Sequence, residues 1–460
     1  MRGIAILLIL ILIFPYAIVL PKDCECKYDM VIIAPKEFIK ALEPLAEHKT
    51  KHGILTKLVD IEDVYDQTFW CGRDDAEKLK YFIKLAHERW GIKYVLLVGG
   101  KKGQTPYDDY WIPVRYSYLS RKYEDLKETK FLTDLYFADI YDKNGNFSSW
   151  DDNNNCVFGE WPENGVAIDR PDLHPDVYLG RLPCRNVREV KIVVKKIIEY
   201  ESHDWSNETW FKRFVVVAGD TYPEKTDYYD GEVYTQQGIN YMKGFNPVRL
   251  WASEGNLSWI NVVRAINNGC GFIWFSGHGN PASWSTHPPN SEKWITGLKL
   301  WQMIFLHNGK KLPICISGSG CFNNMFNVSI FKSEWVYFKG LIPYNIPFCW
   351  GWALVRHPYG GSIATIAATA FSYESPDISR GEGGIEWLDM HFFEQYRKKN
   401  LKTLGEVWAK TIDAFLQNFT IDWDDPSENG SALIAKNVEE WLLIGDPSLR
   451  IGGYPSIRIS

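Results

Sequence analysis

Two Gly-rich turns near the middle of the chain hold a histidine and a cysteine, the side chains from which a thiol acyl-transfer site can be built. In GFIWFSGHGN, His278 lies between Gly277 and Gly279, and in LPICISGSGC, Cys321 follows Gly320. Each turn follows an apolar run of strand length, and in a parallel α/β sheet such turns lie at the carboxyl ends of strands, where ligands bind. If the two strands are neighbours, a nucleophile, a proton acceptor and backbone N–H groups share one rim.

Two other interpretations of these turns are open. Apolar strands that end in Gly turns occur in every doubly wound fold, and cysteine is among the most buried residue types, so both residues could be structural. The run Gly318-Ser-Gly-Cys-Phe-Asn323 also half-resembles a dinucleotide-binding fingerprint. It lacks the third Gly and opens no obvious amphipathic helix, so the sequence favours acyl transfer over nucleotide binding.

Composition indicates an ordinary globular protein. The chain has 460 residues, of which 45% are hydrophobic and 23% are charged, so it can bury one large core or two. Its net charge is -6 and no basic stretch stands out, which argues against nucleic acid as a partner.

The N-terminus predicts export. Arg2 precedes an apolar run from Ile4 to about Leu20, so residues 1–25 fit a signal peptide or, because no clean cleavage site follows, a retained signal anchor that would tether the protein to a membrane. We therefore expect a secreted or cell-surface protein. The cysteine count is nine, which leaves at least one thiol unpaired in an exported protein, and Cys321 is the natural candidate.

Alternating strand and helix patterns predict a mostly parallel sheet with helices on both faces. The pattern runs through residues 26–172, where it is interrupted by a loop-rich stretch from 101 to 172, and starts again in residues 173–460. We expect an N-terminal α/β subdomain over 26–172 and a catalytic subdomain over 173–460. The apolar segments that we expect to form the sheet are 30–34, 55–60, 94–100, 177–183, 214–220, 247–251, 271–277, 312–318, 360–368 and 441–451.

The segment from 139 to 160 concentrates carboxylates and amides with little apolar content. Oxygen ligands at alternate positions suit Ca²⁺, although the spacing is not that of an EF-hand. A solvated loop of Asx turns is an equally good interpretation. If the segment binds a structural calcium ion, the predicted ligands are Asp139, Asp142, Asn144, Asp151, Asn153 and Glu160.

The order of these segments resembles the gingipain-type cysteine peptidases, peptidase family C25. The resemblance covers residues 29–452 and rests on VIIAPKEF, YVLLVGG, PDVYLGRLPCRNVREVKIVVKKIIEYE, FVVVAGD, the His–Gly turn, the Gly–Cys turn and GDPSL. It implies a caspase-like α/β/α sandwich with a mostly parallel sheet and two side-by-side subdomains.

The resemblance also implies roles for individual residues. Cys321 matches the nucleophile, and His278 matches the base and acid. Asp220, which ends FVVVAGD, matches an acid that orients the imidazole, and a strand-terminal carboxylate on the same rim could do so. The backbone N–H groups of Gly279 and Cys321 would form the oxyanion hole.

Substrate choice is implied by a further match. In the arginine-specific members an Asp at the start of a helix lies at the bottom of the specificity pocket, and Asp230 stands at that place, with Glu232 as a second candidate. A buried carboxylate selects a cation, and Arg can pair with it in bidentate fashion. An Asp just ahead of a helix can equally be only an N-cap. Tyr373 is the nearest aromatic to the family's lid over the pocket.

We therefore expect an exported cysteine endopeptidase that acts on proteins or peptides and cleaves after basic residues, Arg in particular. A transpeptidase of the same family and a catalytically silent surface-binding protein are the alternatives. His278 and Cys321 are 43 residues apart, which is longer than expected for the family, and the insert WSTHPPNSEKW lies between them.

Overall fold

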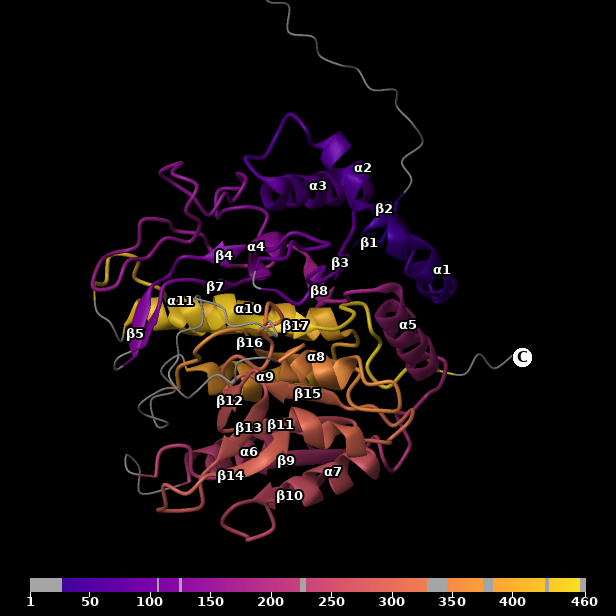
Figure 1. Cartoon of the computed structure of the whole chain (residues 1–460), viewed down its shortest axis with the longest axis vertical. Helices are drawn as coiled ribbons and strands as arrows, with labels where there is room; N and C mark the ends of the chain where they lie inside the picture. The colour runs from indigo at the N-terminus through magenta and orange to yellow at the C-terminus, as the bar shows by residue number, and fades with distance from the viewer. Residues whose placement is uncertain are drawn as a thin grey trace, which may run out of the picture.

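A ten-stranded sheet forms the centre of the protein (Figure 1). The computed structural model describes residues 27–105, 107–123, 126–223, 229–328, 346–374, 384–426 and 430–455. The strand order is β10-β9-β11-β15-β16-β17-β8-β3-β1-β2. Along this order the strands span Asn246–Trp251, Arg213–Ala218, Phe272–Ser276, Ile314–Ser317, Ala364–Ala368, Trp441–Ile444, Tyr178–Leu182, Tyr94–Val98, Met30–Ala34 and Thr56–Asp60.

The sheet consists of two parallel halves that run in opposite directions. Strands β10, β9, β11, β15 and β16 are parallel to one another, as are β17, β8, β3, β1 and β2. The only antiparallel pairing within this sheet, among the described strands, joins β16 to β17. The carboxyl ends of the two halves therefore lie at opposite edges, which separates the end of β3 from the ends of β11 and β15.

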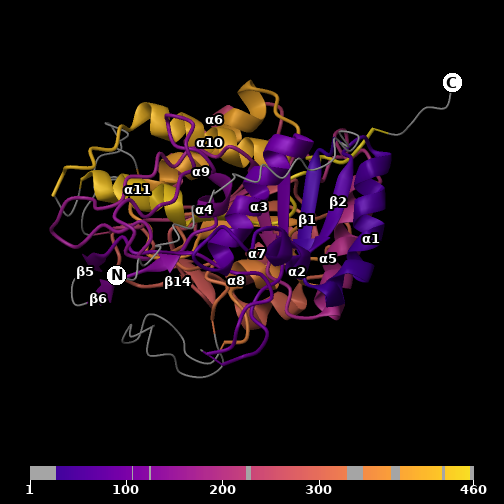
Figure 2. The ribbon, with the colours of Figure 1, turned by 90° about the horizontal axis from the view of Figure 1, so that it is seen from above.

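Helices cover both faces of the sheet, as the alternating pattern predicts. Figure 2 shows α6, α9 and α10 on one side and α1, α5, α7 and α8 on the other. In the half that contains the histidine and cysteine turns, Trp274 faces the first layer and Phe275 faces α7 and α8. The helices are α1 Lys36–Lys51, α2 Ile61–Gln67, α3 Asp75–Trp90, α4 Leu135–Ala138, α5 Val187–Glu201, α6 Asp230–Tyr241, α7 Trp259–Asn267, α8 Trp350–Val355, α9 Ile385–Lys398, α10 Leu404–Asn418 and α11 Ser431–Glu440.

Smaller sheets and a 3₁₀ helix accompany the ten-stranded sheet. The loop-rich stretch from 101 to 172 contains two two-stranded sheets, β4 Tyr116–Ser117 with β7 Phe131–Leu132, and β5 Arg121–Tyr123 with β6 Leu126–Glu128. After β11 comes a three-stranded antiparallel sheet of β12 His278–Asn280, β13 Ser283–Thr286 and β14 Ile295–Lys299, followed by the 3₁₀ helix η1 Leu300–Phe305. This second group occupies the long interval between His278 and Cys321.

The α/β/α sandwich and its mostly parallel sheet confirm the predicted fold class. The predicted signal segment, residues 1–25, lies outside the described residues. Within the described ranges no helix combines the length and the apolar character needed to cross a membrane. The seven cysteines in these ranges, Cys321 included, are all free.

A buried charge triad joins the two ends of the chain. The Lys49 ammonium on α1 lies 2.8 Å from Glu201 and 2.7 Å from Asp446, and all three side chains are fully buried. Burial lowers the pKa of Lys49, but the two carboxylates outweigh burial and raise it overall. Asp446 belongs to the GDPSL segment, so this segment has a structural role in the triad.

Replacing Lys49 by Met should destabilise the protein strongly, because Glu201 and Asp446 would remain buried without their cation. We expect a loss of about 3–5 kcal/mol in the free energy of unfolding, measured by denaturant titration. Lys51→Met, an exposed change on the same helix, is the control and should shift it by less than about 0.5 kcal/mol. Burial alone would raise the pKa of Glu201, but the charge of Lys49 and the hydrogen bonds to the carboxylate lower it by more, so the net shift is downward. The contribution of Glu201 is thus present at neutral pH and is lost as the pH falls through the carboxylate range. Equal stabilities of the two variants would contradict the role of the triad.

Candidate active site

The histidine turn and the cysteine turn pack directly against each other. Strand β11 pairs in parallel with β15, with Phe272 opposite Ile314, so both turns emerge at one rim. A Cβ atom built on Gly279 would lie 2.5 Å from the carbonyl carbon of Gly320. Because nothing larger than hydrogen fits there, Gly279 is required for this close approach.

The thiol of Cys321 lies beside Ser372, in the segment that follows β16. Its Sγ is 3.3 Å from the Ser372 hydroxyl oxygen and accepts from the Ser372 N–H at 3.4 Å. Burial raises the pKa of Cys321 to about 11 although both Ser372 contacts lower it. The resting side chain at neutral pH is therefore a thiol, and it needs a base to become a nucleophile.

The backbone around Cys321 leaves one N–H group available. Phe322 donates its N–H to Ala370 at 3.0 Å, and Gly320 donates to Ser317 at 3.1 Å. No residue that the structure describes accepts from the N–H of Cys321 itself. Phe322 has φ 61°, a left-handed conformation that turns the chain sharply just after the thiol.

The imidazole of His278 is hydrogen-bonded to a backbone carbonyl group. Its Nε2 lies 2.8 Å from the carbonyl oxygen of Thr221. A carbonyl only accepts, so Nε2 carries the proton and Nδ1 is the basic nitrogen. This tautomer allows Nδ1 to take the proton of a thiol.

Asp220 does not make the predicted contact with the imidazole. It is fully buried, and its Oδ2 accepts from the Asn290 N–H at 3.0 Å. Within the described part of the chain its carboxylate forms no hydrogen bond to His278, whose ring bonds to the next residue, Thr221, instead. Burial raises the pKa of Asp220, and the nearby His287 opposes that rise. A role for Asp220 in orienting the ring stays a prediction and would act through the backbone that it anchors.

Asp230 is connected to His278 by hydrogen bonds through Thr221. It is the first residue of α6, and its Oδ1 accepts from the Thr221 N–H at 2.6 Å and from the Gly231 N–H at 2.8 Å. Thr221 thus links this carboxylate to His278. The N-cap of α6 is Tyr229, so the alternative of a simple N-cap does not describe Asp230. Burial raises the pKa of Asp230 more than its backbone contacts lower it.

The carboxylate of Glu232 is hydrogen-bonded to Ser253. Its two carboxylate oxygens accept from the N–H and the hydroxyl of Ser253, at 2.9 and 2.5 Å. A carboxylate with both oxygens occupied by Ser253 is a weaker candidate for recognising a substrate cation than Asp230.

Glu374 is a second carboxyl group beside Asp230 that the sequence did not single out. Burial raises its pKa well above the ordinary value, and the charge of Asp230 adds to the rise. Its Oε1 is buried and has no hydrogen-bond partner among the residues described. Its position two residues after Ser372 places it on the segment that faces the thiol.

Tyr373, the predicted aromatic lid, packs inward. Its N–H and carbonyl bond to the Asn437 side chain at 3.0 and 2.9 Å, and its ring lies 5.5 Å from the buried ammonium of Lys436. The contacts of Tyr373 are therefore with α11, and its function as a lid stays a prediction.

The insert between the two turns brings an aromatic residue to the histidine. The Trp294 ring lies 5.2 Å from the ring of His278 and 3.9 Å from that of His287, and Trp294 is 57% exposed. Sequence reasoning noted the insert WSTHPPNSEKW only as a departure from the family. Its aromatic content was the available signal that it borders the site.

Asp389 on α9 holds the turn that leads to the nucleophile, and sequence reasoning missed it. This fully buried carboxylate accepts from the Gly318 N–H at 2.9 Å and from the indole N–H groups of Trp274 and Trp441 at 3.2 and 3.1 Å. Burial raises its pKa to about 7 although these contacts lower it. No sequence signal distinguished this Asp from others on an amphipathic helix.

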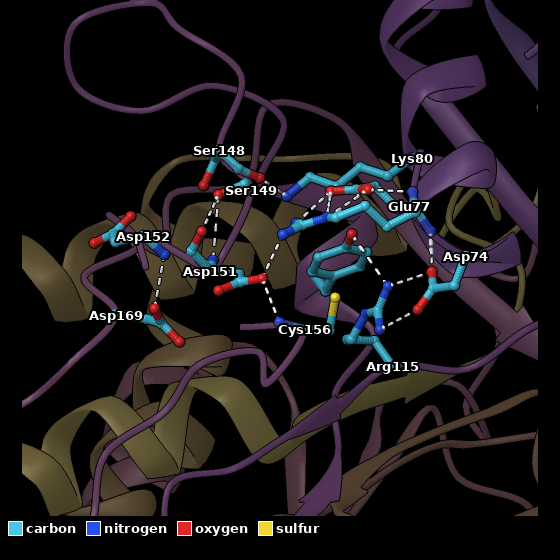
Figure 3. Close-up of polar contacts among 12 residues, drawn as sticks. Asp74, Glu77, Lys80, Arg115, Ser148, Ser149, Asp151, Asp152, Cys156 and Asp169 are labelled. Carbon is cyan, nitrogen blue, oxygen red and sulfur yellow. Dashed lines mark hydrogen bonds and ion pairs between the residues drawn. The ribbon is translucent and has the colours of Figure 1, made fainter. Parts of the chain in front are cut away.

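Figure 3 shows part of the acidic loop, where Asp151 accepts from the Cys156 N–H and the Asp152 N–H donates to Asp169. Asp139 accepts from Ser148 and Trp150, and Asp151 pairs with Arg73 and accepts from the Cys156 N–H. Protein donors thus engage both carboxylates, although Asp139 Oδ1 is buried without a hydrogen-bond partner among the described residues.

The remaining predicted ligands form local turns. Asp142 accepts from the N–H groups of Asn144 and Asn146, and Asn155 donates to both Asn153 and Glu160. In the described ranges no three His, Cys, Asp or Glu side chains form a metal-binding group. The contacts match the Asx-turn interpretation, and the six residues together do not fit one calcium ion. Calcium binding stays a prediction without a visible site.

Comparison with known proteins finds a family that matches nearly the whole chain. The model of peptidase family C25 matches residues 25–452. Gingipain R2 of Porphyromonas gingivalis is 21% identical over 431 residues, which cover 92% of this chain and 46% of the relative. Gingipain R1 of the same species is 20% identical, with 92% of this chain and 34% of the relative covered. The chain therefore spans half or less of the length of these curated relatives.

Among solved structures, the Arg specific cysteine proteinase gingipain R has a similar fold. The TM-score is 0.60 at 18% identity, and the match covers 94% of this chain and 79% of that one. The complex of the Porphyromonas gingivalis RgpB pro- and mature domains gives a TM-score of 0.59 at 18% identity, with 92% and 79% covered. These similarities confirm the caspase-like fold that the sequence predicted.

Proposed function

Because the chain belongs to peptidase family C25, we propose that it is a cysteine endopeptidase in which Cys321 attacks the scissile carbonyl and His278 transfers the proton. The observation that carries this proposal is the packing of Gly279 against Gly320, which places the histidine turn and the cysteine turn at one rim. The high pKa of the thiol makes a nearby base necessary, and the tautomer of His278 supplies one.

The proposed reaction has two stages. His278 Nδ1 takes the thiol proton as the sulfur of Cys321 bonds to the substrate carbonyl carbon, and the carbonyl electrons move to oxygen. The C–N bond then breaks, the leaving amine takes the proton from the imidazolium, and a thioester remains. Water, deprotonated by the same imidazole, attacks the thioester and returns the thiol.

The oxyanion would be stabilised by backbone N–H groups of the two turns. The N–H of Cys321 has no acceptor among described residues, so it is available for a developing negative charge. Gly279 would supply the second N–H, and its lack of a side chain leaves the carbonyl a path to it.

We propose that the residue on the acyl side of the cut is basic, with Arg preferred. Asp230 is connected to His278 through Thr221, and its charge adds to the raised pKa of Glu374, so a cation is the ligand that would relieve this repulsion. The guanidinium of Arg can bond to two oxygens at once, whereas the ammonium of Lys acts as a point charge. The similarity to an Arg specific proteinase supports this choice.

Asp230→Asn should reduce cleavage after Arg by roughly a hundredfold relative to cleavage after neutral residues, because it removes the charge from a desolvated pair. The amide oxygen can still accept from the Thr221 N–H, so His278 should stay in place. A peptide library that varies the acyl-side residue measures the preference.

Glu232→Gln is the matched control and should leave the preference unchanged, since Ser253 holds that side chain. Cleavage mainly after apolar or acidic residues would contradict the assignment of Asp230. Loss of selectivity in the Glu232 variant alone would transfer the role to Glu232.

We also propose that the protein acts outside the cytoplasm, where proteins and peptides are its substrates. The support is the apolar segment from Ile4 to Leu20 after Arg2, which would direct export and could remain as a membrane tether.

A further inference from the structure

Ser372 touches the reacting sulfur with more than one group. Its hydroxyl oxygen is 3.3 Å from Cys321 Sγ, its N–H donates to that sulfur at 3.4 Å, and its carbonyl oxygen lies 3.9 Å from it. Ser372 follows β16, the strand that pairs with β15, so the sheet itself brings this segment alongside the cysteine turn.

Buried side chains fix the residues on both sides of Ser372. The Lys436 ammonium donates to the carbonyl of Phe371 at 2.6 Å, and the Asn437 side chain bonds to both the N–H and the carbonyl of Tyr373. Lys436 is fully buried and Asn437 is 1% exposed. The position of Ser372 next to the thiol is therefore set before any substrate arrives, and costs no reorganisation during reaction.

The charged groups near the thiol do not stabilise a thiolate in place of the Ser372 hydrogen bonds. The Lys436 ammonium pairs with Glu440 at 2.6 Å and with Glu128 at 2.9 Å, so two carboxylates offset its charge. The other titratable groups on this segment are Tyr373 and Glu374, and burial raises the pKa of both, which keeps them neutral. Hydrogen bonds are thus the means by which this side of the site can favour a thiolate.

We propose that Ser372 is a further catalytic residue, whose hydroxyl and N–H stabilise the thiolate of Cys321 during attack. This inference rests on the proposed function. When His278 removes the thiol proton, the negative sulfur accepts from both groups of Ser372, and hydrogen bonds to a charged acceptor are about twice as strong as those to a neutral one. Carbon–sulfur bond formation then removes the charge, so the hydroxyl contributes mainly to forming the nucleophile.

Ser372→Ala removes the hydroxyl and keeps the N–H. At a fixed pH near neutrality, we expect iodoacetamide to alkylate Cys321 about tenfold more slowly, because less thiolate is present. Alkylation is followed as a function of pH by mass spectrometry of the peptide that contains Cys321, and the profile should move to higher pH. Ser372→Thr keeps a hydroxyl and should restore most of the rate.

Cys156, which is exposed on the acidic loop, is the internal reference and should react equally in all variants. Ser202→Ala, a change at an exposed serine at the end of α5, is the matched control. Melting temperatures establish that the variants are folded, and Ser372→Gly provides a second removal of the hydroxyl.

A Cys321 alkylation profile that is the same in wild type, Ser372→Ala and Ser372→Gly would overturn the proposal, whether or not peptides are cleaved. If alkylation shifts as expected but no peptide is cleaved by the wild type, the role of Ser372 toward the thiolate stands and the proposed peptidase activity fails. The two proposals are therefore tested separately.

Discussion

Cys321→Ala should abolish peptide cleavage while leaving the protein folded. Removing a nucleophile from a site of this kind lowers the turnover number by about a millionfold, because every later step depends on the covalent intermediate. The side chain is small and partly exposed, so we expect the free energy of unfolding to change by less than about 1 kcal/mol. Hydrolysis of an Arg-containing peptide and denaturant titration measure the two quantities.

Cys156→Ala is the control for this experiment, because it removes an exposed thiol from the acidic loop. It should leave both activity and stability unchanged. Normal cleavage by the Cys321 variant, or a disulfide at Cys321 in active protein, would show that another residue is the nucleophile.

His278→Ala should lower the turnover number by about a hundred- to ten-thousandfold, the range for loss of a general acid–base residue. The defect should be larger at neutral pH than at pH 10. Burial raises the pKa of Cys321 to about 11, so without the imidazole the thiolate forms in quantity only as the pH approaches that value. A residual defect should persist at high pH, because the leaving amine still lacks its proton donor.

Asp220→Asn provides the comparison within the site, and should cost less than the histidine change because the Asp220 carboxylate bonds to the Asn290 N–H and not to the imidazole. His203→Ala, at an exposed position, should have no effect. A turnover number for His278→Ala within a factor of a few of wild type, across the whole pH range, would remove His278 from the mechanism.

The sequence determined the elements of this protein and the two turns that carry its chemistry. Apolar runs such as MVIIA and ICIS are buried strands because burial removes their side chains from water, and their observed bounds lie within or match the predicted segments. The last predicted segment, 441–451, is a strand only over Trp441–Ile444. The sequence also placed glycines around His278 and Cys321, and the structure shows that Gly279 packs on Gly320.

The direction of the strands was decided only by tertiary structure. Alternation of strands and helices predicts parallel neighbours, but it carries no information on how two parallel halves join. Strand β17 pairs antiparallel with β16 and parallel with β8. This arrangement depends on contacts between residues far apart in the chain, which no local pattern records.

The same limit applies to the residues that support the site. Ser372, Glu374 and Asp389 lie 51, 53 and 68 positions after Cys321, in segments whose patterns show only a strand end and an amphipathic helix. The contacts of Ser372 with the thiol and of Asp389 with the turn at Gly318, and the electrostatic influence of Asp230 on Glu374, arise from strand order and helix packing. Asp220 shows the converse case, in which a carboxylate at the expected strand end bonds to Asn290 of the insert instead of the imidazole. Residue type and local spacing singled out Cys321 and His278, because a turn is a local structure. Their partners were decided by tertiary structure, because hydrogen bonds form between whichever groups the packing brings within reach.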